Sequence, residues 1–222
     1  MYAERAYLDE AARRLEAILG VDLVGVYASG SWALGGYEAG RSDLDVAVVV
    51  RAPLRDEAAE RIVAALREEE LPCPARGLEL VVYTAESAAS GAAEPGFELN
   101  LNTGAGMPFR ADRTPQPGER HWFPIDRSVL ARHGVALVGP PAADVFAAPP
   151  QAELRPMLAE VLRWYAREDP DSEDGVLNAG RSLRFARDGV WLPKPALRDW
   201  ASEQPGTNAE ILARAIAELE AF

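Results

Sequence analysis

Two aspartates directly before an apolar run have the residue type and spacing best suited to bind a metal ion or to take part in catalysis. They are Asp43 and Asp45, in the stretch GSWALGGYEAGRSDLDVAVVV from Gly30 to Val50. Residues two apart on a strand point to the same face, roughly 6.5 to 7 Å apart, so both carboxylates leave one surface together. Their repulsion at pH 7 must be relieved by a shared proton or by a cation, and such oxygen ligands favour Mg²⁺. We therefore expect phosphoryl or nucleotidyl transfer.

Residues on either side of this pair fit the same chemistry. Gly30 and Ser31 end the preceding strand, where glycine lets backbone N–H groups approach closely and a serine hydroxyl can bond a phosphate oxygen. A third carboxylate, Glu79, lies inside the expected strand GLELVVYT. If that strand adjoins the one with Asp45, Glu79 completes an acidic trio as a metal ligand or as the general base.

Each of these signals alone has an ordinary structural explanation. An Asp-x-Asp sequence near a strand end is often a cap or a turn, and Glu79 also fits an exposed strand position. The combination of a Gly-Ser pair, the two aspartates and a strand carboxylate after one helix is much more selective, and it favours a functional site.

Apolar periodicity predicts the elements that must position these residues. The expected elements are helices over 4–19, 55–71 and 125–133 and strands over 21–28, 43–50, 77–84 and 135–138. The stretch 91–120 is rich in glycine and proline and has little periodicity, so we expect a long loop there that borders the site. The order of elements predicts a mixed α/β layer.

The prolines at 140, 141, 149 and 150 mark the best domain boundary, and only helical periods follow them. The predicted fold class is α/β plus all-α. An N-terminal α/β domain over 1–150 has a mixed β-sheet and flanking helices, and a helical bundle over 151–222 forms the C-terminal domain.

Composition narrows the classes of partner. The 222 residues are 48% hydrophobic, enough for a substantial core, and the net charge of −12 repels nucleic acid but attracts a cationic small molecule. The single cysteine, Cys73, excludes an internal disulfide and suits a reducing compartment. No apolar run resembles a signal peptide or a membrane span. We expect a cytoplasmic monomer that binds neither nucleic acid nor membrane.

The segment from Gly30 to Val50 resembles the signature of the polymerase-β-like nucleotidyltransferase superfamily. The rest of the chain is similar to the streptomycin/spectinomycin adenylyltransferases, best in GLELVVYT, HGVALVGPPAADVF and VLNAGRSLRFARDGVWLPKPALRDWA. This resemblance implies an N-terminal nucleotidyltransferase domain. It also implies transfer of AMP from ATP to a hydroxyl of an aminoglycoside-like molecule, with release of pyrophosphate, in a cleft between the two domains. Antibiotic resistance would be the result.

The resemblance also implies roles for individual residues. Ser31 and Ser42 would help hold the phosphates, Asp43 and Asp45 the Mg²⁺ ions, and Glu79 would be the catalytic base. Arg181 and Lys194 would contact the ATP phosphates, and the acidic patch with Asp171 and Asp174 would face the cationic acceptor. Each of the last four also fits an exposed helix or loop position. The stretch FELNLNTGAGM departs from the family in its central loop, so the acceptor stays open.

Two other functions are compatible with the same residues. One is nucleotide transfer to a protein or RNA end, which the acidic balance and the added helical domain disfavour. The other is a catalytically inactive nucleotide-binding regulator, which the presence of all three acidic residues disfavours.

Overall fold

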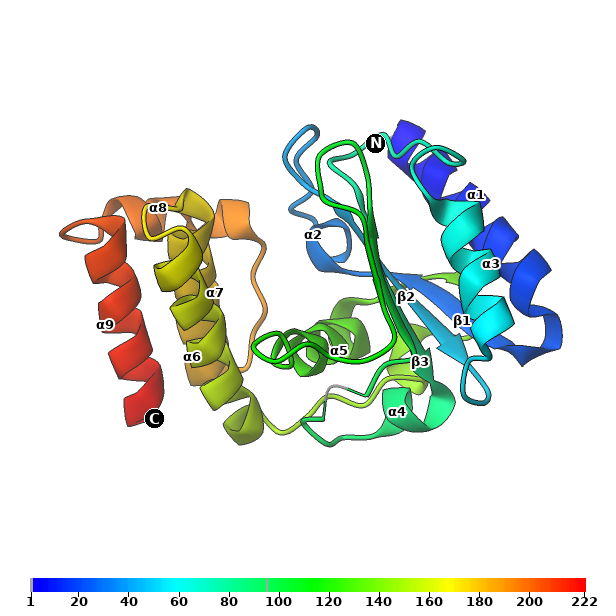
Figure 1. The fold of residues 1–222 in the computed structure, drawn as a ribbon. Coiled ribbons are helices and arrows are strands. Elements are labelled where there is room, and N and C mark those ends of the chain that lie inside the picture. Colours follow the sequence, from blue (N-terminus) through cyan, green and yellow to red (C-terminus); the bar gives the residue numbers. More distant parts are fainter. Residues whose placement is uncertain (1, 95) are drawn as a thin grey trace.

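The computed structural model describes residues 2–94 and 96–222, which form a central β-sheet with helices on both faces (Figure 1). The strands are β1 (Leu23–Ala28), β2 (Leu44–Val50), β3 (Leu78–Thr84), β4 (Leu99–Thr103), β5 (Arg110–Asp112) and β6 (Val135–Val138). The α-helices are α1 (Tyr2–Leu19), α2 (Gly30–Ala33), α3 (Asp56–Leu66), α4 (Ala85–Ala89), α5 (Trp122–His133), α6 (Gln151–Glu168), α7 (Glu173–Asp188), α8 (Arg198–Ser202) and α9 (Asn208–Ala221). Short 3₁₀ helices are η1 (Gly20–Asp22), η2 (Ala142–Asp144) and η3 (Lys194–Leu197).

The sheet is mixed, with the strand order β5-β4-β3-β2-β1-β6. Among the described residues only β2 and β3 pair in parallel, and α3 supplies the crossover that a parallel connection needs. Their register begins with Leu44 opposite Leu78, so the two strands start level with each other. Polar residues at the N-terminal ends of these two strands therefore lie side by side at one end of the sheet.

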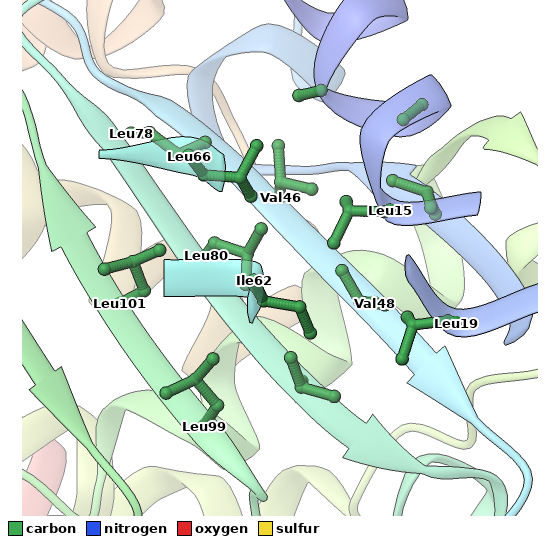
Figure 2. Close-up of a cluster of buried hydrophobic side chains, with 14 of the residues drawn as sticks. Leu15, Leu19, Val46, Val48, Ile62, Leu66, Leu78, Leu80, Leu99 and Leu101 are labelled. Atoms are coloured by element: carbon green, nitrogen blue, oxygen red, sulfur yellow. The ribbon is translucent and has the colours of Figure 1, made fainter. Parts of the chain in front are cut away.

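One face of the sheet is covered by α1 and α3 (Figures 1 and 2). Every second residue of the two central strands enters this core, where leucines and isoleucine of the two helices meet them. The labelled members are Leu15, Leu19, Val46, Val48, Ile62, Leu66, Leu78, Leu80, Leu99 and Leu101. Strands that are buried on both faces read as near-continuous apolar runs, which is why the carboxylates are confined to the strand starts.

The opposite face of the sheet packs on α5. Tyr27, Val49 and Tyr83 share a core with Phe123 and Leu130 of this helix. The other side of α5 carries apolar residues that pack with α6, α7 and α9 in a separate core. Helix α5 is therefore buried from two sides and lies between the sheet and the C-terminal helices (Figure 1).

The C-terminal helices have clear start and stop signals. The N-cap side chain of Ser172 accepts a hydrogen bond from Gly175 N–H at the start of α7, and Gly189 ends that helix with φ +68°. A capping box of Thr207 and Glu210 starts α9. Helix α6 begins at Gln151, directly after the proline-rich segment. The predicted fold class, a mixed sheet with flanking helices followed by a helical region, is confirmed; the division into two domains at residue 150 stays a prediction.

The sequence prediction was wrong in the stretch 91–120, which is not a continuous loop. It contains β4 and β5, because Leu99 and Leu101 alternate with Asn100 and Asn102 and bury one face of a strand. Smaller differences lie at element ends. Helix α3 stops at Leu66 rather than residue 71, the first strand starts at Leu23 after a 3₁₀ turn, and α5 starts three residues earlier than expected.

Candidate active site

The parallel register brings Asp45 and Glu79 together. They are direct partners on β2 and β3, so their side chains leave the same face of the sheet, the face that α5 covers. Asp43 lies one residue before β2, and its Oδ2 is 3.1 Å from Nη2 of Arg76. All three predicted acidic residues therefore lie at the end of the sheet where the two parallel strands begin.

Gly30 is pressed against Asp45. Its φ is +54°, and a Cβ built on it would lie 1.7 Å from Oδ2 of Asp45. The backbone N–H of Ser29 also donates to the Asp45 carbonyl at 2.9 Å. Only glycine leaves room for this carboxylate, so the Gly-Ser pair and the Asp-x-Asp motif form one packed unit.

The two serines of the prediction differ in their surroundings. The Ser31 hydroxyl is buried and has no hydrogen-bond partner among the described residues. The Ser42 hydroxyl accepts the Glu38 N–H at 3.0 Å and closes the loop before β2. Ser31 thus has an unused hydrogen-bonding group beside Gly30, whereas Ser42 already has a role in loop structure.

Arg181 projects from α7 toward the carboxylates. Its Nη2 donates to Asn178 Oδ1 at 2.7 Å, and Asn178 Nδ2 donates to the Tyr165 hydroxyl at 2.9 Å. Burial lowers the pKa of Arg181, while the nearby charges of Tyr165, Asp126 and Asp45 act in the opposite direction. A guanidinium is thus held in place and faces the acidic cluster.

Lys194 reaches the site from η3. A Cβ on Gly36 would lie 2.6 Å from Cβ of Pro193, so the loop after α2 packs directly on the segment that carries this lysine. The Nζ of Lys194 is 3.4 Å from Oδ2 of Asp174, and its positive charge partly opposes the rise that burial causes in the pKa of Asp45 and Glu79. The helical region therefore contributes two cationic side chains, Arg181 and Lys194, to the end of the sheet that carries the carboxylates.

The two predicted acceptor residues have different places. Asp174 also lies 3.6 Å from Arg41 Nη2, so two cations share its carboxylate. Asp171 is exposed, and it is held through its backbone carbonyl, which accepts Asn208 Nδ2 at 2.7 Å. The structure brings Asp174 next to the cationic groups, whereas Asp171 is exposed and bonded to the start of α9.

Burial and the repulsion of neighbouring carboxylates raise the pKa of Asp45 and Glu79. Burial is the main cause for Asp45, whose pKa lies well above its usual range, with the charges of Asp43 and Glu79 adding to it. Burial, Asp43 and Asp126 raise the pKa of Glu79 to about 7. Neither Asp45 nor Glu79 accepts a hydrogen bond or forms an ion pair within the described part of the chain. These carboxylates lack the donors that normally compensate a buried charge.

Sequence reasoning missed three residues of this region. Asp126 of α5 is a fourth carboxyl, and burial and the charge of Asp45 raise its pKa to about 8. Arg76 pairs with Asp43, and Asn102 of β4 is the direct partner of Glu79. The only available signal for Asp126 was a carboxylate between apolar positions of a predicted helix. Arg76 lies in a segment without periodicity, and the alternation around Asn102 is short and flanked by glycines and prolines.

Comparison with known proteins gives a result at the level of the fold. The sequence matches no protein-family model and no curated protein. The fold is similar to that of spectinomycin adenyltransferase AAD(9). The structure compared is the crystal structure of that enzyme from Enterococcus faecialis with ATP and spectinomycin. The TM-score is 0.67 at 18% identity, over 97% of this chain and 89% of that one.

The likeness to AAD(9) includes both the sheet and the C-terminal helices, since nearly the whole chain is covered. It confirms the expected resemblance to the streptomycin/spectinomycin adenylyltransferases as a resemblance of fold. Many functions share one fold, so the substrate has to be argued from the site.

The donor set fits Mg²⁺ in part. Within residues 2–94 and 96–222, no three carboxylate, histidine or cysteine side chains converge as the ligands of one metal ion would. Asp43 is paired with Arg76 instead. Mg²⁺ usually keeps several waters and takes only one or two carboxylates beside substrate phosphates, a demand that Asp43 and Asp45 can meet. Asp45 has no donor among the described residues, and this lack together with its raised pKa fits a cation at this place.

Proposed function

We propose that this protein transfers AMP from ATP to a hydroxyl of a cationic, aminoglycoside-like molecule of the streptomycin or spectinomycin type, releases pyrophosphate and so gives resistance. One observation carries the proposal. Three acidic side chains, Asp43, Asp45 and Glu79, gather where two parallel strands begin, and Arg181 and Lys194 of the helical region act on them electrostatically. The fold shared with AAD(9) supports the same reaction class.

Glu79 is the proposed general base. Its carboxylate accepts the proton of the acceptor hydroxyl, whose oxygen forms a bond to the α-phosphorus of ATP. The bond from that phosphorus to the bridging oxygen of the β-phosphate breaks, and pyrophosphate leaves. A pKa of about 7 suits this role, because a base is most effective when its pKa is near the working pH.

The residues around Glu79 would hold the nucleotide. The Gly30 backbone, the Ser31 hydroxyl and Ser42 would bond phosphate oxygens, and the lack of a partner for the Ser31 hydroxyl among the described residues supports its part in this. Arg181 and Lys194 would offset the charge of the triphosphate. Asp43 and Asp45 would hold Mg²⁺, which when bound neutralises phosphate oxygens and stabilises the charge that develops at phosphorus.

The acceptor is proposed to be cationic. The net charge of −12 attracts ammonium and guanidinium groups, and Asp171 presents an exposed carboxylate. Asp174 contributes less free charge, because Lys194 and Arg41 already pair with it. A monomeric state and a cytoplasmic location remain predictions of the sequence.

The decisive experiment is a mass-spectrometric search for acceptors heavier by one AMP unit. The protein, ATP and Mg²⁺ are incubated with a panel that includes streptomycin and spectinomycin. Glu79→Gln should lower the rate of AMP transfer by at least about 100-fold, because general base catalysis contributes about that much or more, while ATP affinity stays within about threefold. Glu86→Gln, on the exposed side of α4, is the matched control and should keep the wild-type rate.

If no panel member gains mass although ATP binds with Mg²⁺, the acceptor class is wrong. If Glu79→Gln transfers AMP as fast as wild type, Glu79 is not the base.

A further inference from the structure

We propose that Asn102 orients the acceptor by accepting a hydrogen bond from a donor group on the carbon next to the attacking hydroxyl. This inference rests on the proposed function and adds a specificity-determining residue to it. It also narrows the acceptor to molecules with donors on adjoining carbons, that is, vicinal diols or vicinal amino alcohols.

The placement of Asn102 follows from the sheet register. Asn102 of β4 lies directly opposite Glu79 of β3 in an antiparallel pair. On the same strand Leu99 and Leu101 enter the core below α1 and α3, so Asn100 and Asn102 leave the other face, where Glu79 lies. Side chains directly opposite each other in such a pair have Cβ atoms about 4.5–5.5 Å apart.

The amide oxygen of Asn102 has an unused acceptor capacity. Its Oδ1 is buried, and none of the described residues donates a hydrogen bond to it. The neighbour on its other side, Arg110 of β5, does not supply one, because its guanidinium is bound to Asp112 and Glu119. A buried acceptor without a donor costs about 1–3 kcal/mol, so a ligand that brings a donor to this point gains affinity.

The two side chains would act on neighbouring groups of one molecule. Glu79 receives the proton of the attacking hydroxyl, so that hydroxyl must lie at its carboxylate. The Oδ1 of Asn102 is one side-chain position away across the sheet and can accept a hydrogen bond only from a group that carries an O–H or N–H. Within one substrate molecule, the shortest spacing between two donor groups is found on adjoining ring carbons. Such a pair can reach Glu79 and Asn102 together, and the two contacts fix which hydroxyl faces the α-phosphorus.

A comparison of Asn102→Leu with Asn100→Leu tests this. Both changes replace an asparagine on the same face of β4 by leucine, which is of nearly the same size but has no amide. Asn100 differs in lying opposite Val81 rather than Glu79. Rates of AMP transfer to streptomycin and spectinomycin are measured together with ATP affinity and the slow release of pyrophosphate when water is the acceptor. Asn102→Leu should lower kcat/KM for the antibiotic about 10- to 100-fold, with ATP affinity and the water reaction within about twofold. Asn100→Leu should keep all of them.

A pair of small probes tests the requirement for adjoining donors. Wild type should transfer AMP to trans-2-aminocyclohexanol at least about 10-fold faster than to cyclohexanol at equal concentration, and Asn102→Leu should lose this preference. Equal use of the two probes by wild type overturns the requirement.

Wild-type kinetics in Asn102→Leu, or equal losses in both leucine variants, overturn the assignment of Asn102 while leaving AMP transfer intact. No AMP product with any antibiotic or probe overturns the proposed function instead, and this inference with it.

Discussion

Replacement of Gly30 by alanine should show whether the position of the Asp45 carboxylate matters for activity beyond any effect on the stability of the loop. The new Cβ would lie 1.7 Å from Oδ2 and 2.4 Å from Cγ of Asp45. Carbon and oxygen atoms in contact normally lie about 3.5 Å apart, so one of the two residues must move by roughly 1.5 to 2 Å. The strand that carries Asp45 is buried on both sides of this position, so its backbone stays in place and the Asp45 carboxylate is the group that must turn away.

Two separate losses follow from this geometry. An L-residue at φ +54° costs about 1–2 kcal/mol, which lowers the Tm of a chain of this size by roughly 2–8 °C. A displacement of more than about 1 Å at a site that positions the reacting groups costs about 100-fold or more in rate. Gly30→Ala should therefore show a moderate loss of stability and a nearly complete loss of AMP transfer.

The chain provides a matched control five residues away. Gly35 also has a positive φ, +72°, but a Cβ on it meets no atom within 4 Å. Gly35→Ala carries the same kind of backbone strain without the contact to Asp45. Differential scanning calorimetry and the rate of AMP transfer are measured for both variants. Equal Tm values with at least about 30-fold lower activity in Gly30→Ala would support the argument, and equal activity in the two variants would refute it.

Two further predictions concern buried charges. Without divalent ions, Asp126→Asn should raise the free energy of unfolding at pH 8 by about 1–3 kcal/mol, and the gain should shrink toward pH 5.5. The reason is that burial raises the pKa of Asp126 in the folded state from 3.8 to about 8, so wild type loses stability as pH rises through this range. Urea denaturation at several pH values checks this prediction, with the exposed Asp199→Asn as control. Parallel pH profiles for wild type and Asp126→Asn would contradict it. Arg127 is 1% exposed and donates to four backbone carbonyls at and after α4, so Arg127→Leu should cost about 3 kcal/mol and lower the Tm by roughly 6–12 °C. The exposed Arg120→Leu should leave the Tm within about 2 °C, and an unchanged Tm in Arg127→Leu would show that the buried guanidinium adds nothing.

The local signals of the site were predictable because they depend on neighbours in the sequence. The period of two placed Asp43 and Asp45 at the head of a strand and Glu79 inside another. Their meeting was only conditional, since it depends on which strands pair and in what register. The register of β2 and β3 fulfils that condition and places Asp45 directly beside Glu79.

The residues that sequence reasoning missed depend on packing between distant segments. Asp126 comes close to Asp45 only because α5 crosses the sheet on the face that carries the carboxylates. Asn102 was hidden because β4 is short and glycines and prolines surround it, which made the whole stretch read as loop. Asp171 shows the reverse case, since membership of an acidic sequence patch did not bring it next to the cationic side chains.

Helix α5 limits how this architecture can be recombined. Phe123 and Leu130 belong to the sheet core, whereas Ile125 and Val129 belong to the core of the C-terminal helices. An exchange of helical regions between related proteins would keep both interfaces matched only if the incoming region suited the α5 of its new host. The two halves of the molecule are therefore expected to change in concert, with α5 as the part that each must continue to fit.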